Sequence, residues 1–248
     1  QCMDGSTGNI YVAPGYSSGR RKWVIYFQGG GWCAPSWLAH LDGYSPQEDV
    51  GHPDLCEERA KGYHGSSLGD EDTRDFTDRG ILSGDPTVNP LAYTWNRVMV
   101  RNCDGTLFLS DAELPSGVQL RGRRNALKAI QQLLEGDLGD ATEIILGGCS
   151  AGAVAAVVLG DQIAQMVREV AGPRRGREVF IAILSDSGFF LDWSEKGIKV
   201  PRNVLNFPQF PWLFEVGNVS EALSEECLKA GHSWRCMLLP TAIRYVKT

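Results

Sequence analysis

A serine stands at the centre of Gly-Cys-Ser-Ala-Gly at residues 148–152, between an apolar run at 144–146 and a second apolar run at 153–159. Glycines two positions away on each side of a serine, between a strand and a helix, are typical of a nucleophile elbow. Such a turn holds the hydroxyl above a sheet, beside helix N–H groups that can stabilise an oxyanion. We therefore predict that Ser150 is a nucleophile and that the Ala151 amide is an oxyanion donor.

A glycine triplet at 29–31 follows the apolar, strand-like run 22–28. Glycine leaves the backbone open to close approach and to unusual dihedral angles, so its N–H groups can point at a ligand. In esterases, N–H groups of a glycine-rich loop after an earlier strand complete the oxyanion hole. We predict that the amides of Gly30 and Gly31 serve in this way, although a glycine triplet by itself is more often a plain tight turn.

A serine hydrolase also needs a histidine that accepts the serine proton, and in α/β-hydrolases it follows the nucleophile along the chain. His232 is the one histidine after Ser150. It lies in the small loop that Cys227 and Cys236 could close, and we interpret it as an exposed loop residue. Three histidines precede the serine, and the order of the chain argues against them as the base: His40, His52 and His64.

Asp186 ends a strand-like run at 178–184. Some α/β-hydrolases place the triad acid at such a position, so Asp186 is a candidate for that role. We interpret it instead as a structural residue that hydrogen-bonds the loops beneath the site.

The elements that must position these residues alternate along the chain. Apolar runs predict strands at 22–28, 96–102, 142–147 and 178–184. Periodic apolar residues predict helices at 123–134 and 151–170. This alternation predicts one α/β domain over 1–248, with a mostly parallel sheet and crossover helices. We expect loops and short helices at 33–95, and a lid-like irregular segment at 187–236.

The composition narrows the class of protein. The 248 residues carry a formal net charge of −6, which argues against nucleic acid as a general partner. No apolar run is long enough to span a membrane. The chain has no phosphate-binding loop, no dinucleotide fingerprint and no His/Cys ligand spacing, so we predict neither a cofactor nor a metal. We expect a monomer.

Seven cysteines are scattered along the chain without a CxxC pair, which favours disulfides over a zinc site. Cys149, inside the elbow, is predicted to be the odd, buried and unpaired thiol. Cys227 and Cys236 are close enough to close a small loop, and Asn218 begins a glycosylation sequon. These features are typical of a secreted protein, and a leader peptide, if there was one, is absent from the sequence.

Taken together, the motifs resemble the pectin acetylesterase family, which also includes the animal Wnt-deacylating carboxylesterase Notum. The resemblance runs nearly end to end. It is carried by Cys2-Met3-Asp4-Gly5-Ser6, Gly29-Gly30-Gly31-Trp32-Cys33, Gly80-Ile81-Leu82-Ser83, Asn89-Pro90, Trp95-Asn96, Cys103-Asp104-Gly105, Arg121-Gly122, the elbow at 148–152 and Ser185-Asp186-Ser187-Gly188-Phe189-Phe190.

The resemblance implies an α/β-hydrolase-like fold with Ser150 as nucleophile and with Ala151, Gly30 and Gly31 as oxyanion donors. It also implies three disulfides, which leave Cys149 free: Cys2–Cys103, Cys33–Cys56 and Cys227–Cys236. The glycine triplet before Trp-Cys, and the Cys-Asp-Gly after the second strand, resemble the pectin acetylesterases more than Notum. The expected activity is therefore removal of acetyl groups from cell-wall polysaccharide, outside the cell.

In the family, the triad acid and histidine lie on loops after later strands. We therefore expect the 248 residues to be a fragment that lacks the C-terminal strands, the acid and the base. Two alternatives stay open. One is a Notum-like protein deacylase with a pocket for a long acyl chain. The other is a non-catalytic carbohydrate-binding or degenerate member that has lost the histidine.

Overall fold

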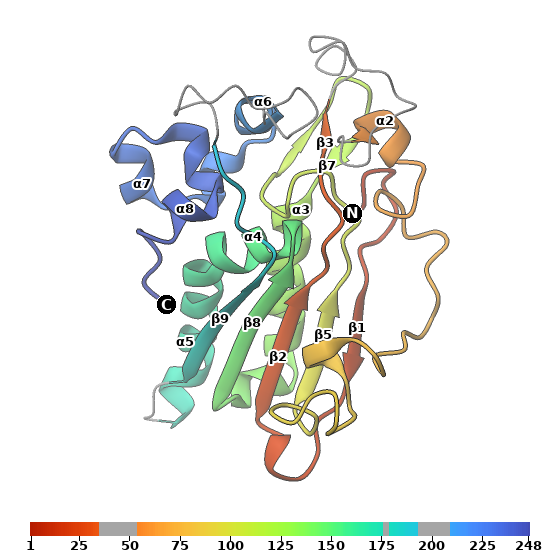
Figure 1. The fold of residues 1–248 in the computed structure, drawn as a ribbon, viewed down its shortest axis with the longest axis vertical. Coiled ribbons are helices and arrows are strands. Elements are labelled where there is room, and N and C mark those ends of the chain that lie inside the picture. The colour runs from red at the N-terminus through yellow and green to blue at the C-terminus, as the bar shows by residue number, and fades with distance from the viewer. Residues whose placement is uncertain (35–53, 176–178, 193–208) are drawn as a thin grey trace.

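The computed structural model describes residues 1–34, 54–175, 179–192 and 209–248 (Figure 1). Its main sheet has five strands in the order β1-β5-β2-β8-β9. Strand β2 pairs in parallel with β5 and with β8, and β8 pairs in parallel with β9, whereas β1 runs antiparallel to β5. The strands are β1 Ile10–Ala13, β2 Lys22–Phe27, β5 Asn96–Val100, β8 Glu143–Cys149 and β9 Phe180–Asp186.

The predicted α/β architecture is confirmed, and each of the four predicted strands is present. The antiparallel strand β1 was missed because Ile10–Ala13 is too short to give a clear alternation of apolar and polar residues. The structure also contains two small sheets that the sequence did not indicate. They are β3 Cys33–Ala34 with β4 Asp54–Leu55, and β6 Ala112–Glu113 with β7 Gln119–Leu120.

Helices cover one face of the sheet. Trp23, Ile25 and Phe27 of β2 belong to the main apolar core, which also contains apolar residues of the helices. Helix α4 contacts β2, β8 and β9, and α5 packs against both α4 and α3. The helices on this side are α3 Gly122–Glu135, α4 Ala151–Val158 and α5 Gly160–Arg175.

The single helix expected at 151–170 is in fact two helices, α4 and α5, which are separated at Leu159. A Cβ on Gly160 would lie 2.6 Å from Cδ1 of Ile183, so the chain passes very close to β9 at this point. Helix α3 agrees with its predicted range at 123–134 to within one residue at each end.

The opposite face of the sheet is covered by the long connection before β5 rather than by long helices. Val24 of β2 and Met99 of β5 form a second apolar cluster there with Phe76, Leu82 and Trp95. The described part of 33–95 contains short elements only, as predicted: β3, β4, α2 Cys56–Arg59 and the 3₁₀ helix η2 Gly80–Leu82. The other 3₁₀ helices among the described residues are η1 Ser17–Gly19, η3 Asp137–Asp140, η5 Val219–Ala222 and η6 Ser233–Met237.

The described part of 187–236 is more regular than expected, because most of it from residue 209 onward is helical. This part and the segment that follows it lie near the upper, carboxyl ends of β8 and β9 (Figure 1). Its α-helices are α6 Gln209–Val216, α7 Glu225–Lys229 and α8 Leu239–Ala242. Helix α8 contacts α4, and α6 contacts β3.

Disulfides tie these parts together. The three pairings that the resemblance implied are present: Cys2–Cys103, Cys33–Cys56 and Cys227–Cys236. Cys149 is free, as expected, but it is half-buried rather than buried. It is the last residue of β8, where the packed sheet opens toward the site. None of the helices described in the structure is long and apolar enough to cross a membrane.

Candidate active site

Ser150 lies between the end of β8 and the start of α4, in the strand–turn–helix setting that its sequence pattern predicted. Its backbone has φ 53° and ψ −119°, a conformation that non-glycine residues rarely adopt. Such strain is concentrated at functional sites. The amide of Ser150 donates to the carbonyl of Asp186 at 2.8 Å, and its own carbonyl accepts from the amide of Ala153. The turn is therefore held from β9 on one side and from α4 on the other.

The two elbow glycines are required by close backbone contacts. A Cβ on Gly148 would lie 2.2 Å from the carbonyl oxygen of Gly152, and a Cβ on Gly152 would lie 2.0 Å from that of Phe27. Neither position has room for a side chain, because the atoms met are backbone atoms. The glycines let helix α4 start directly against the ends of β8 and β2, which leaves Ser150 at the turn between them.

The glycine-rich loop after β2 lies next to Ser150. A Cβ on Gly29 would be 3.3 Å from Cβ of Ser150 and 2.7 Å from the carbonyl oxygen of Cys149. Gly30 has φ 144° and Gly31 has φ 66°, so both adopt conformations that favour glycine. The amides of Gly30, Gly31 and Ala151 donate to no other residue that the structure describes. Their N–H groups are thus unused among the described residues, and their role as oxyanion donors stays a prediction.

The loop is held by hydrogen bonds at both of its ends. At its start, the amide of Gln28 donates to the carbonyl of Val100 at 3.0 Å. The side chain of Gln28 accepts from the amide of Asn102 and donates to the hydroxyl of Tyr63, both at 3.1 Å. At its end, the amide of Cys33 donates to the carbonyl of Gly105 at 2.9 Å. The turn after β5 therefore supports the glycine loop.

Asp104 organises that supporting turn from within the protein. Its Oδ2 accepts from the amide and the hydroxyl of Thr106, at 2.9 and 2.7 Å, and from the amide of Phe108 at 3.0 Å. Burial raises the pKa of the Asp104 carboxyl, although these hydrogen bonds act in the opposite direction. A buried carboxylate that receives three such bonds defines the path of the turn.

Asp186 lies on the other side of Ser150, at the end of β9, and is exposed to solvent. Its carboxylate accepts from the hydroxyl of Tyr26 at 3.3 Å and from that of Ser187 at 2.9 Å. Burial is the main cause that raises the pKa of Tyr26, and the charges of Cys149 and Asp186 add to it. Burial also raises the pKa of the Cys149 thiol. These contacts agree with the structural interpretation of Asp186, and its role stays a prediction.

Two histidines can be placed. His232 is not an exposed residue as we expected: it is half-buried, and its Nε2 lies 3.0 Å from the hydroxyl of Tyr245. Its loop packs against the C-terminal segment, which explains the difference. His64 precedes Ser150 and was for that reason not predicted to be the base. It lies against the glycine loop. His40 and His52 fall outside the described residues.

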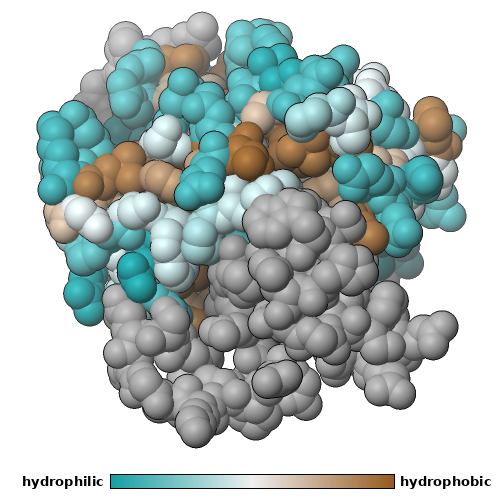
Figure 2. Space-filling view, turned by 90° about the horizontal axis from the view of Figure 1, so that it is seen from above, coloured by the Kyte–Doolittle hydropathy of each residue, from teal (hydrophilic) through white to brown (hydrophobic). Residues whose placement is uncertain are grey.

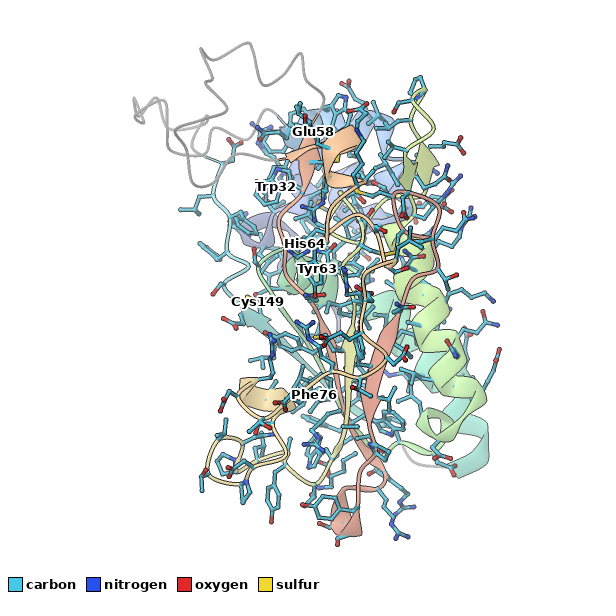
Figure 3. The ribbon with its side chains drawn as sticks, turned by 90° about the vertical axis from the view of Figure 1, so that its right-hand side faces the viewer. Trp32, Glu58, Tyr63, His64, Phe76 and Cys149 are labelled. Atoms are coloured by element: carbon cyan, nitrogen blue, oxygen red, sulfur yellow. A yellow bond between two sulfur atoms is a disulfide. The ribbon has the colours of Figure 1, made fainter. Side chains whose placement is uncertain are left out.

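The position of His64 is one that the sequence analysis missed. A Cβ on Gly30 would lie 2.4 Å from the His64 ring, so the imidazole packs directly on the loop. Tyr63 packs against His64 with ring centroids 4.9 Å apart (Figure 3). No local pattern around 63–64 signals this contact, because it depends on the Cys33–Cys56 disulfide and on the fold of the following segment.

Figure 2 views the molecule from the end at which the parallel strands finish. Apolar residues form a broken band among hydrophilic ones on the described part of this face. Among the described residues, no three His, Cys, Asp or Glu side chains are grouped so that they could hold a metal ion.

The parallel sheet, the strained serine between strand and helix, and the adjacent glycine loop define a protein of the α/β-hydrolase type. A model of the pectinacetylesterase family matches residues 1–248, and the chain belongs to that family.

Individual relatives agree with this assignment. Pectin acetylesterase 5 of Arabidopsis thaliana is 29% identical over 254 residues, which cover 100% of this chain and 52% of the relative. Palmitoleoyl-protein carboxylesterase NOTUM of Schmidtea mediterranea is 22% identical over 260 residues, covering 100% of this chain and 44% of the relative. The chain thus spans about half the length of the curated relatives it matches.

A solved structure of the Wnt deacylase Notum from Drosophila has the same fold, with a TM-score of 0.76 at 24% identity. The match covers 100% of this chain and 66% of that structure.

Proposed function

We propose that the protein is a serine carboxylesterase that removes acetyl groups from cell-wall polysaccharide such as pectin. The observation that carries this proposal is the position of Ser150, in a strained turn directly beside the glycine loop. Membership of the pectinacetylesterase family supports the reaction class, and the names of the Arabidopsis relatives support the polymer. The three disulfides support an extracellular location.

In the proposed reaction, Oγ of Ser150 attacks the ester carbonyl carbon, and the carbonyl oxygen becomes an oxyanion. The amides of Ala151, Gly30 and Gly31 donate to that oxyanion. Its collapse breaks the bond to the sugar oxygen, which takes up a proton as it leaves and gives the free hydroxyl. Water then attacks the acyl-enzyme, which releases acetic acid and restores Ser150. The group that moves these protons is not assigned to a residue of this chain.

The first test is Ser150→Ala in the natural full-length protein. Roughly a thousandfold or greater loss of acetyl release is expected, because the nucleophile and its covalent intermediate are lost. Ser116→Ala is a matched control, since Ser116 lies on an exposed turn. Hydrolysis that persists unchanged in Ser150→Ala would contradict the proposal. A wild-type protein that binds the polymer, releases no acetate and is not labelled at Ser150 by a fluorophosphonate would support the non-catalytic alternative.

The aromatic packing beside the glycine loop bears on the length of the acyl group. The Trp32 ring lies 5.4 Å from that of Phe190 and 5.2 Å from that of Phe210, and Trp32 and Phe210 are buried. We infer that this packing next to the glycine loop leaves room for a short acyl group only, which favours acetyl. We expect the protein to hydrolyse 4-nitrophenyl acetate faster than 4-nitrophenyl octanoate. The opposite order would favour a deacylase for long acyl chains.

A further inference from the structure

Tyr63 is an exposed aromatic residue in a hollow beside the glycine loop. The hollow has a volume of about 220 Å³ and is lined by residues of one segment: Glu58, Arg59, Gly62, Tyr63 and His64. Pockets that enclose a drug-sized ligand occupy roughly 300–1,000 Å³. This hollow is smaller and open to solvent, which suits a single ring of a longer chain better than a whole small molecule.

The Tyr63 ring is held firmly although 45% of the residue is exposed. The guanidinium of Arg101 lies 3.8 Å from the ring centroid, and the Tyr63 hydroxyl accepts from the side chain of Gln28. Arg101 is itself buried and paired with Asp70, and it also donates to the carbonyl of Tyr63. A ring held in this way loses little conformational entropy when a ligand covers it.

The hollow lies on the far side of the glycine loop from Ser150. Gly29 approaches Ser150, whereas the next residue, Gly30, approaches the ring of His64. Figure 3 shows Tyr63 and His64 between the levels of Trp32 and Cys149. His64 both lines the hollow and packs on Gly30, so the hollow adjoins the loop that lies beside Ser150.

We propose that Tyr63 is a stacking surface for a pyranose ring of the polysaccharide, next to the ring that carries the ester. This proposal rests on the proposed function and adds a binding site to it. An aromatic ring buries the C–H face of a sugar and gains apolar contact, while the sugar hydroxyls at the rim keep polar partners. The exposed carboxylate of Glu58 lies at this rim and can accept from a hydroxyl.

The test measures binding separately from hydrolysis. In the full-length protein carrying Ser150→Ala, the dissociation constant for an acetylated hexagalacturonide is determined by calorimetry. Adding Tyr63→Ala should weaken binding roughly tenfold or more, because the stacking contact is lost. Tyr63→Phe should bind as the parent does, because it keeps the ring. Tyr16→Ala is the matched control, since Tyr16 is 47% exposed and packs edge-on against Tyr93. It lies before β2, at the end of the sheet opposite to the carboxyl ends of the parallel strands.

Three outcomes would overturn the stacking site: equal binding by the parent and by Tyr63→Ala, equal weakening by Tyr16→Ala, or no binding of the hexamer by the parent. Thermal unfolding of each variant shows whether it is folded. The proposed function is judged by a different measurement, the Ser150-dependent hydrolysis of 4-nitrophenyl acetate. If the protein hydrolyses 4-nitrophenyl acetate but Tyr63→Ala does not weaken binding of the hexamer, the esterase proposal stands and only the stacking site is rejected.

Discussion

The two sides of Ser150 are built differently. On the β5 side, the glycine loop packs against a buried turn that contains Asp104, and a disulfide from Cys103 ties that turn to the start of the chain. On the β9 side, residues 184–187 are exposed, and among the described residues the Asp186 carboxylate accepts from the hydroxyls of Tyr26 and Ser187. Phe180 and Leu184 of β9 are 64% and 41% exposed.

This difference indicates which part of the site depends on packing for its chemistry. Oxyanion stabilisation needs donors that are already in place, since reorganising them during the reaction would raise the barrier. The β5 side offers that rigidity through buried hydrogen bonds and covalent links. On the β9 side, the described residues hold the serine turn through one backbone hydrogen bond, from the amide of Ser150 to the carbonyl of Asp186. Substitutions on the two sides should therefore differ in their effects.

The largest effect is expected from the disulfide on the β5 side. Cys2 and Cys103 are separated by 101 residues, whereas Cys227 and Cys236 are separated by 9. Closing a 100-residue loop removes about 4.7 kcal/mol of chain entropy from the unfolded state, and a 15-residue loop about 3 kcal/mol. Replacing Cys2 and Cys103 with serine should therefore lower the free energy of unfolding more than replacing Cys227 and Cys236. Urea unfolding of both double variants measures this difference, and the reverse order would contradict the conclusion that the β5 side is the more firmly held.

The second effect concerns the glycine loop. Gly30→Ala should lower kcat roughly a hundredfold, the range found when one oxyanion donor is lost. The new methyl group would collide with the His64 ring at 2.4 Å, and φ 144° is unfavourable for alanine. Gly117→Ala is the control, because Gly117 also has positive φ but a Cβ there would meet open space. Unchanged kcat in Gly30→Ala, measured on 4-nitrophenyl acetate, would show that the loop does not position the donors.

A smaller effect is expected for Asp186→Asn. The backbone carbonyl that accepts from Ser150 is retained, and an amide oxygen can still accept from Tyr26. The expected change in kcat is within about threefold, since an exposed residue with replaceable hydrogen bonds contributes little. A loss of turnover of roughly a thousandfold with unchanged thermal stability would instead identify Asp186 as the triad acid. That result would give the β9 side a catalytic function and would remove the contrast between the two sides.

The sequence predicts best those features that a local pattern determines. The elbow glycines can be recognised because the contacts that exclude a side chain at 148 and 152 arise within one strand–turn–helix unit and its neighbouring strand. The four strands are long and apolar enough to be found in the same way. The disulfides followed from the resemblance to a family, since seven cysteines allow many pairings.

Features that depend on distant contacts could not be predicted. The break between α4 and α5 depends on the approach of Gly160 to Ile183 in β9. The contact of Gly30 with His64 joins two segments that are linked through the Cys33–Cys56 disulfide. The half-buried state of His232 depends on Tyr245, thirteen positions away along the chain. In each case the tertiary structure, and not the local propensity, decides the outcome.

The smallest effect is expected at Cys149, which lies at the boundary between the two sides. Burial raises the pKa of its thiol, and the charge of Asp186 adds to this effect. The thiol form therefore dominates at neutral pH, and only the thiolate reacts quickly with alkylating agents. Iodoacetamide should modify Cys149 slowly at pH 7 and faster as the pH rises toward and beyond the raised pKa.

Cys149→Ala should change kcat by less than about twofold, because the thiol is given no part in the reaction and the substitution is a modest one. Rapid alkylation at pH 7 would show instead that the β8 end is more open, or more positively charged, than the burial of Cys149 and the nearby charge of Asp186 imply. The contrast would then lie within the elbow itself, with a firmly packed Gly148 followed by a loosely packed Cys149. Mass spectrometry after timed alkylation at several pH values separates the two possibilities, because the disulfide-bonded cysteines do not react.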